Sequence, residues 1–207
     1  MSNARKDWVD YAKGIGIILV VYGHLLSSGY HIGLAIPKHF FELSDSIVYT
    51  FHMPLFFLLA GLFAEGSLQK RGAWGYLKDK LLRIAYPYLV WSIIQISVEI
   101  LFSSQTQKKA EFSDILKIAY RTWGQFWFLY ALLLMFIVFT LIKQTGKFSM
   151  PLLYFTGVIL FFKPLHISTA ALLGFSTHFL FFILGIGLRR WLMEKNTLSL
   201  QPWAILL

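Results

Sequence analysis

Long apolar runs alternate with short polar segments along almost the whole chain. A helix needs about 20 mostly apolar residues to cross a bilayer. The pattern predicts six such helices, over about residues 8–26, 46–64, 82–102, 126–142, 150–165 and 168–188. The runs show no sustained alternation of apolar and polar residues, which argues against an outer-membrane β-barrel. The sequence therefore predicts an all-α, polytopic bundle of transmembrane helices.

The last residues resemble the opening of a further span. Residues 202–207 read Pro-Trp-Ala-Ile-Leu-Leu after a basic and then a polar stretch. They would form either the start of a seventh span, which is the interpretation we favour, or a short interfacial anchor with Trp203 at the headgroups. We therefore expect residues 1–207 to form a single integral membrane domain, a C-terminally truncated and so incomplete version of a larger bundle.

Composition and charge narrow the class of protein. Hydrophobic residues make up 57% of the 207 residues and charged residues only 14%, against roughly 45–50% and about 25% in soluble domains. The net charge of +9 comes from cations that lie between apolar runs, so we read them as topology signals and expect no nucleic-acid partner. With the N-terminus in the cytoplasm, thirteen of the nineteen Lys and Arg residues fall on cytoplasmic segments. This bias predicts a multi-pass protein of the inner membrane with a cytoplasmic N-terminus.

The first span carries three ionisable residues on one face. Lys13 and His24 are eleven positions apart, which is three helical turns plus roughly 20°, and Asp10 lies within about 40° of His24. Asp10 and Lys13 form a candidate ion pair at the cytoplasmic edge, with His24 about 16 Å further along the helix. Histidine exchanges protons near neutral pH and suits a general base. The alternative is a packing histidine bonded to a neighbouring helix.

The second span begins with two further candidates. His52 lies in its outer half, next to Pro54, which should bend or loosen the helix and free a carbonyl beside a polar cavity. The alternative, which the sequence supports equally, is that His52 is an interfacial residue at a structural kink. Asp45 precedes the span and is interpreted first as an N-cap, with a place in the outer mouth of a site as the alternative.

Other polar residues mark the remaining span ends. Lys80 and Arg83 are three positions apart at the start of the third span, where they either anchor the helix or hold phosphates. Glu99, near the outer end of that span, either pairs with a cation, polarises an acceptor hydroxyl or simply reaches the interface. Trp127 is interpreted as a residue of the aromatic belt, and His178 as a packing residue. The chain has no cysteine, and no span carries ligand-type spacing of His, Asp and Glu, so we expect no metal site.

Four motifs together resemble the acyltransferase-3 family of integral membrane acyltransferases. The run Arg5-Lys6-Asp7-Trp8-Val9-Asp10-Tyr11-Ala12-Lys13-Gly14 through His24 is similar to the first helix of this family, whose signature is a basic residue, ten residues and a histidine. His-Met-Pro-Leu-Phe-Phe-Leu-Leu-Ala-Gly at 52–61, Arg-Ile-Ala-Tyr-Pro-Tyr at 83–88 and Trp-Phe-Leu at 127–129 resemble later motifs. The His-Met-Pro form and the Tyr-Gly-His ending are most similar to the fucose 4-O-acetylase-like branch. Family members usually have about ten spans, and often serine where this chain has Ala60.

The resemblance implies a membrane-bound O-acyltransferase, and most simply an O-acetyltransferase. Cytoplasmic acetyl-CoA would be the acyl donor, with its phosphates near Lys80 and Arg83. His24 would act as general base on a sugar hydroxyl of a cell-envelope or secreted glycan, while Lys13 and Asp10 shape the donor entry. Asp45, His52, Glu99 and Trp127 are the candidates for binding the acceptor. A small-solute transporter, a scaffold and an inactive truncated family member are the competing hypotheses.

Overall fold

The computed structural model describes residues 7–102, 110–146, 149–164 and 169–189. Within these ranges every regular element is helical. The elements are α1 (Asp7–His31), α2 (Lys38–Lys80), the π-helical segment η1 (Leu81–Ala85), α3 (Tyr86–Leu101), α4 (Phe112–Lys117), the 3₁₀ turn η2 (Gly124–Phe126), α5 (Trp127–Gln144), α6 (Met150–Phe162) and α7 (Ala170–Arg189). The all-α prediction is confirmed. The residues expected to start a seventh span lie outside the described ranges.

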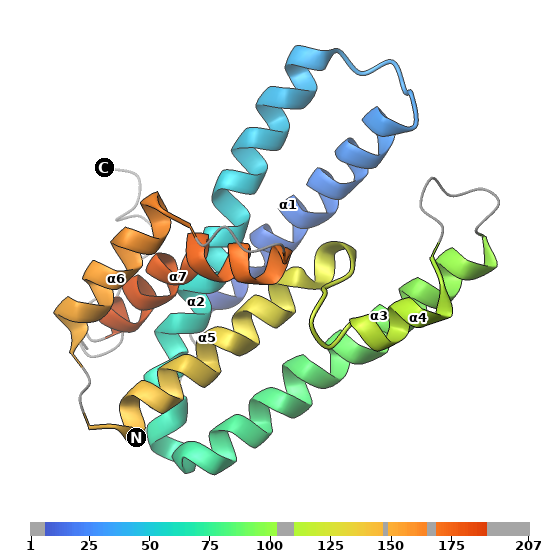
Figure 1. Ribbon diagram of the computed structural model, residues 1–207. Coiled ribbons are helices and arrows are strands. Elements are labelled where there is room, and N and C mark those ends of the chain that lie inside the picture. The colour runs from blue at the N-terminus through green and yellow to red at the C-terminus, as the bar shows by residue number, and fades with distance from the viewer. Residues whose placement is uncertain (1–6, 103–109, 147–148, 165–168, 190–207) are drawn as a thin grey trace, which may run out of the picture.

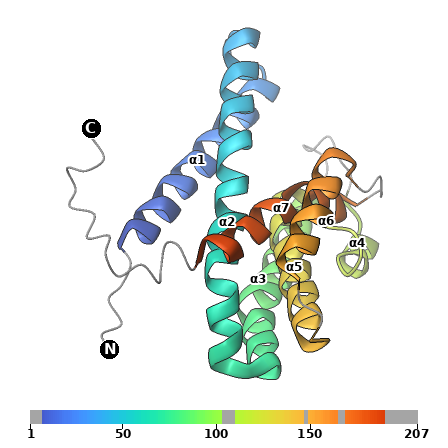
Figure 2. The same ribbon diagram turned by 90° about the vertical axis from the view of Figure 1, so that its left-hand side faces the viewer.

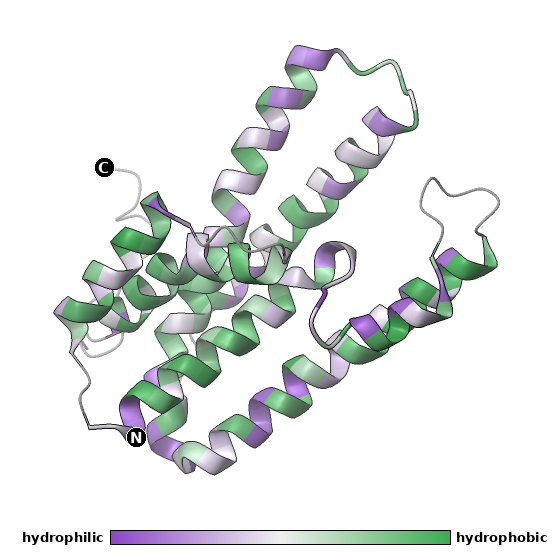
Figure 3. Ribbon diagram, viewed as in Figure 1, coloured by the Kyte–Doolittle hydropathy of each residue, from purple (hydrophilic) through white to green (hydrophobic). Residues whose placement is uncertain are grey.

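Four helical stretches of the described chain are long and apolar enough to cross a membrane. They are Asp7–His31, Lys38–Leu101, Gly124–Gln144 and Ala170–Arg189, and Met150–Phe162 is a shorter apolar helix. The stretch Lys38–Leu101 contains both the second and the third predicted spans. The polar segment between them therefore continues the helix and is no loop. Figure 3 shows hydrophilic ribbon where α2 meets α3 and largely hydrophobic ribbon along α5, α6 and α7.

The change of direction between these two spans lies at Gly72. Its φ of 66° and ψ of 168° make it the one non-helical residue within α2, and glycine adopts positive φ without the steric penalty of a side chain. The backbone stays helical through Pro54, although a proline ring removes one helical hydrogen bond. Sequence reasoning expected Pro54 to bend or loosen the helix and placed the connection between the spans at residues 65–83; Gly72 lies within that connection.

The helices form two groups around α2. The helix α1 and the first half of α2 make an antiparallel hairpin that projects from the rest of the molecule (Figures 1 and 2). The second half of α2 packs against α5 and α7, and α6 covers α7. Gly16 and Gly23 are buried on α1, where the side chains of Phe56, Val48 and Tyr49 press against them. These two glycines bring the histidine-bearing faces of α1 and α2 together.

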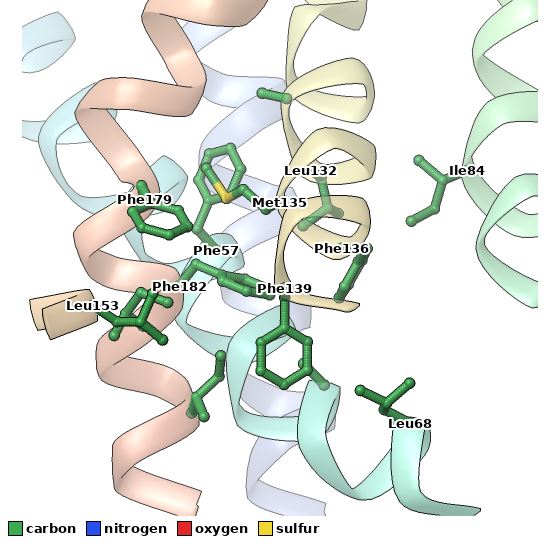
Figure 4. Close-up of a cluster of buried hydrophobic side chains, with 14 of the residues drawn as sticks. Phe57, Leu68, Ile84, Leu132, Met135, Phe136, Phe139, Leu153, Phe179 and Phe182 are labelled. Carbon is green, nitrogen blue, oxygen red and sulfur yellow. The ribbon is translucent and has the colours of Figure 1, made fainter. Parts of the chain in front are cut away.

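The main apolar core lies between α2, α5 and α7 (Figure 4). Phe57, Phe136, Phe139 and Phe182 are almost fully buried there, and Phe136 and Phe139 both contact Phe182 through edge-on rings. Edge-to-face aromatic pairs add to the stabilisation that burial itself provides. This core fixes the position of the N-terminal end of α5, which carries Trp127.

Ion pairs join the C-terminal ends of α5 and α7 to α2. Glu65 of α2 accepts a hydrogen bond of 2.7 Å from Lys143 of α5 and lies 4.0 Å from Nη1 of Arg189 of α7. All three residues were expected at the cytoplasmic ends of their spans. Their meeting shows that the C-terminal ends of α5 and α7 lie at the level of Glu65, within α2.

Candidate active site

A cavity of about 500 Å³ brings together three of the residues singled out by sequence. His24 from α1, His52 from α2 and Trp127 from α5 all line it, and aromatic and aliphatic side chains complete its wall: Ile17, Val20, Tyr49, Met53, Phe56 and Phe128, with Gly124 and Gln125. A mostly apolar cavity with a few polar groups is the usual form of a small-molecule site. The three candidates come from separate helices, so their meeting is a property of the fold.

Both histidines contact Tyr49 through edge-on rings. The ring of His24 is 6.3 Å from that of Tyr49, and the ring of Tyr49 is 5.0 Å from that of His52. His24 is exposed, whereas only 2% of His52 is exposed. His24 is therefore the histidine that a substrate entering the cavity meets directly.

A hydrogen bond to its own helix orients His52. Its Nδ1 contacts the carbonyl oxygen of Val48, so Nδ1 carries the proton and donates it, because a carbonyl only accepts. In neutral imidazole the other nitrogen, Nε2, is then an acceptor. His52 therefore offers the cavity a fixed acceptor, while His24 has the freedom of an exposed side chain.

Trp127 is held in place by α7. A side-chain carbon at Gly174 would overlap the indole ring of Trp127, so glycine is the residue that permits this contact. The ring of His178 lies 5.8 Å from that of Trp127 and 4.9 Å from that of Phe57, and Nδ1 of His178 bonds to the Gly174 carbonyl oxygen at 3.0 Å. His178 thus packs as expected, and what it supports is the tryptophan wall of the cavity.

Asp10 and Lys13 lie about two turns and one turn before Ile17, the first residue of α1 that lines the cavity. Their side chains form the expected ion pair, with 3.9 Å between Nζ and Oδ1, and both are about half exposed. The ammonium of Lys13 also lies 5.8 Å from the centre of the Phe63 ring. The pair shares the helical face of His24 but does not line the cavity.

The N-cap interpretation of Asp45 is wrong. The helix α2 begins at Lys38, with Pro37 before it, so Asp45 lies inside the helix. The polar residues before the second span are strong cap formers, but here they continue a helix that extends beyond the apolar run. Asp45 is seven residues before His52, which places both residues on one face. It does not line the histidine cavity.

Lys80 and Arg83 converge on an aspartate that sequence reasoning did not consider. Asp79 accepts a 2.7 Å hydrogen bond from Nε of Arg83, lies 2.6 Å from Nη1 of Arg71 and is 3.8 Å from Nζ of Lys80. Burial acts to raise the pKa of the Asp79 carboxyl, but the hydrogen bond from Arg83 and the neighbouring cations together lower it. Three cations around one carboxylate leave an excess of positive charge, which suits an anionic ligand.

The two predicted phosphate ligands differ in their surroundings. The side chain of Lys80 is 18% exposed, and its ammonium lies over the rings of Tyr76 and Phe136 at 5.0 and 4.5 Å. Burial lowers the pKa of Lys80, while Asp79 opposes that shift. The side chain of Arg83, in contrast, is 73% exposed. Arg83 is therefore the residue of the two that is open to a ligand.

Glu99 belongs to a separate, polar cavity. Its Oε1 accepts hydrogen bonds from Gln95 at 3.1 Å and from the indole N–H of Trp123 at 3.0 Å. Glu99 is thus neither an isolated interfacial residue nor paired with a cation among the described residues. Sequence reasoning missed Trp123, and also Tyr49 and Gln125 in the histidine cavity, because aromatic and amide residues at span ends are common and carry no specific signal.

The described residues hold no group of three or more His, Cys, Asp and Glu side chains that could bind a metal ion. The role of each site residue remains a prediction.

Comparison with known proteins identifies the family. A family model described as an acyltransferase domain matches residues 6–207. The chain is 28% identical to nodulation protein NolL of Sinorhizobium fredii over 214 residues, covering 100% of this chain and 55% of the relative. It is 25% identical to nodulation protein NolL of Mesorhizobium japonicum over 180 residues, covering 86% of this chain and 47% of the relative. The chain thus spans about half the length of these relatives. No solved structure matches it.

Proposed function

The chain belongs to the acyltransferase-3 family, and on this premise we propose that it is a membrane-bound O-acyltransferase that acts on a sugar hydroxyl. The expected donor is acetyl-CoA, and the expected acceptor is a glycan of the cell envelope or a secreted glycan. The observation that carries the proposal is the cavity in which His24, His52 and Trp127 meet. Within the membrane region of the described chain, it combines proton-exchanging side chains with room for a small acyl group and a hydroxyl.

In the proposed reaction His24 is the general base. It takes the proton of the acceptor hydroxyl as the oxygen attacks the carbonyl carbon of the acetyl thioester. The new carbon–oxygen bond forms, the carbon–sulfur bond breaks, and the electron pair leaves with the sulfur of CoA. His24 then returns the proton to the thiolate. The Nε2 acceptor of His52 would orient the hydroxyl, and Trp127 would exclude water from the reacting atoms.

The donor would approach from the end of α2 that carries Asp79. Its phosphates would bind Arg83, with Arg71 and Lys80 adding positive charge. The stretch of α2 from His52 to Gly72 rises about 30 Å at 1.5 Å per residue, which is the thickness of the hydrocarbon core. The acyl arm must therefore reach into the membrane, past the level of Lys13 and Asp10, to meet His24.

The test is acetyl transfer in native membranes with a matched pair of variants. Membranes containing wild type, His24→Ala or His31→Ala at equal protein levels are incubated with acetyl-labelled acetyl-CoA. Base-labile label in glycan is then measured. His31 is an exposed histidine on the same helix that bonds to Ser27 and does not line the cavity. Loss of a general base typically costs about 10²–10⁴-fold in rate, so we expect label with wild type and His31→Ala and almost none with His24→Ala.

Two results would contradict the proposal in different ways. Equal label with all three proteins would remove His24 from the reaction. Absence of label with wild type would overturn the acyltransferase function for this chain. Flux of a small solute through the same membranes would then favour the transporter hypothesis.

A further inference from the structure

A second cavity, of about 300 Å³, lies beside α3 and has a polar wall. Gln95 and Glu99 of α3 form one side, and the segment Arg121–Gly124 forms the other. The cavity has one carboxylate and one guanidinium, so its formal charge is balanced. None of these residues except Gly124 lines the histidine cavity.

The segment between α4 and α5, which forms one wall, is fixed by two tyrosines. The hydroxyl of Tyr88 donates to the Ile118 carbonyl oxygen at 2.6 Å, and that of Tyr130 donates to the Ala119 carbonyl oxygen at 2.9 Å. The two tyrosine rings contact each other at 5.4 Å. Because Tyr88 comes from α3 and Tyr130 from α5, the segment is tied to both neighbouring helices. The cavity is therefore formed in advance of any ligand, which reduces the entropy cost of binding.

The carboxylate in this wall is oriented with one oxygen available. Both hydrogen bonds of Glu99, from Gln95 and from Trp123, go to Oε1. No hydrogen bond to Oε2 is found among the described residues. A carboxylate held this way presents its second oxygen as a strong acceptor for a donor such as a sugar hydroxyl.

A buried hydroxyl in the same wall has no partner. Among the residues that the structure describes, no group is bonded to Oγ1 of Thr122, although this atom is buried. An unsatisfied buried polar atom costs roughly 1–3 kcal/mol, so its presence in a cavity wall calls for a partner. Thr122 lines the cavity, so a ligand bound there can supply that partner.

Gly124 connects this cavity to the histidine cavity, because it lines both. Its φ of 51° favours glycine, and a side-chain carbon there would lie 3.0 Å from Nε2 of Gln95. The backbone at the start of η2 is thus the shared border. In Figure 1 the segment leading into α5 extends from the side of α3 toward the α1–α2 hairpin.

We propose that the Glu99 cavity binds an uncharged pyranose ring of the acceptor, whose reacting hydroxyl enters the histidine cavity past Gly124. The inference rests on the proposed function and adds where and by which groups the sugar is recognised. Glu99 accepts from ring hydroxyls, and Gln95, Arg121 and Thr122 donate to ring oxygens. The balanced charge favours a neutral sugar over an acidic one.

The test measures sugar binding separately from acetyl transfer. Saturation-transfer NMR with a panel of methyl hexopyranosides is applied to purified wild type, Glu99→Gln, Arg121→Gln and the control Glu42→Gln. Glu42 is an exposed carboxylate near the start of α2 that pairs with Lys38. We expect at least a tenfold weaker affinity for the preferred glycoside with Glu99→Gln and Arg121→Gln. Wild-type affinity is expected with Glu42→Gln.

The outcomes separate this inference from the proposed function. Two results, each together with acetyl transfer by wild type, would overturn the inference alone. One is an unchanged glycoside affinity in both Glu99→Gln and Arg121→Gln. The other is that no glycoside binds. Glycoside binding that depends on Glu99 without acetyl transfer would support the sugar site and overturn the function. Arg121 is exposed, so Arg121→Gln should fold normally. It therefore still tests the inference if Glu99→Gln does not fold.

Discussion

At the scale of single residues, the ring of His52 has one nitrogen bonded to its own helix and one left for the cavity. His52→Asn retains a donor near the position of Nδ1 and loses the acceptor Nε2, whereas His52→Gln places a polar group near Nε2. A single hydrogen bond contributes about 0.5–1.5 kcal/mol, so we expect His52→Asn to lower the rate of acetyl transfer about tenfold with a normal folded yield. His52→Gln should retain more of the rate. Equal rates for both variants and wild type would show that His52 only packs.

Asp79 gives a prediction on the pH dependence of stability. Its pKa in the folded protein lies below the ordinary value of 3.8, so its ion pairs stabilise the fold above that value. The contribution is lost as the pH falls through the lower, folded-state pKa. We expect Asp79→Asn to lower the Tm in detergent by a few degrees at pH 7, and the difference from wild type to shrink only below about pH 4.

The control for this prediction is Glu42→Gln, which removes an exposed carboxylate with a single lysine partner. It should leave the Tm nearly unchanged at pH 7, because exposed ion pairs contribute little. A difference between Asp79→Asn and wild type that stays constant from pH 7 to pH 3 would contradict the role assigned to the Asp79 ion pairs.

Residue spacing predicted some of these contacts and missed others. The Asp10–Lys13 pair follows from helical geometry within one element, and the structure confirms it. The burial of the Lys80 ammonium over Tyr76 and Phe136 could not be predicted, because Phe136 is on another helix. The same holds for Glu99. Its hydrogen bond from Gln95 follows from a spacing of four residues on one helix, whereas its hydrogen bond from Trp123 could not be predicted, because Trp123 lies beyond α4.

At the scale of elements, the crossing of α2 and α7 depends on two glycines. A side-chain carbon at Gly61 would overlap the carbonyl oxygen of Phe182, and one at Gly185 would overlap that of Leu58. Both obstacles are backbone atoms, so the helices themselves must move apart. Small residues at such crossings let membrane helices approach closely.

We therefore expect Gly61→Ala and Gly185→Ala each to destabilise the protein by about 1–3 kcal/mol, the usual cost of overpacking. Gly14→Ala on α1 is the matched control, because nothing lies within 4 Å of the carbon it would add. It should be neutral or stabilise by up to about 1 kcal/mol, since alanine favours helices. Thermal unfolding in detergent measures all three. A Gly61→Ala variant as stable as Gly14→Ala would show that α2 and α7 are not packed this closely.

Helix existence was predicted better than helix extent. The apolar runs at 126–142 and 168–188 correspond closely to α5 and α7. The run at 46–64, however, covers less than half of α2, because the polar residues before and after it also adopt helical structure. Hydropathy reports where a helix meets lipid or core, and polar helical turns outside that zone carry no apolar signal.

At the scale of the whole molecule, the proposed chemistry depends on residues that are far apart in the sequence and meet in the fold. His24, His52 and Trp127 line one cavity, while Lys143 and Arg189, at the C-terminal ends of α5 and α7, pair with Glu65 within α2. Alternating spans predicted which ends share a side, but not that these particular side chains would touch. Helix tilt and rotation are set by packing, and packing depends on contacts such as those of Gly61 and Gly174.

The predicted orientation in the membrane can be tested directly, because the chain has no cysteine of its own. His39, at the start of α2, and Gln69, near Gly72, are both exposed, and α2 between them is long enough to cross the bilayer. The excess of Lys and Arg beside Gln69 predicts that this end lies in the cytoplasm. We expect a membrane-impermeant maleimide to label the His39→Cys variant in intact cells, and the Gln69→Cys variant only after permeabilisation. The reverse pattern would place the Asp79 ion pairs on the outer side, where cytoplasmic acetyl-CoA cannot reach them, and would contradict the proposed path of the donor.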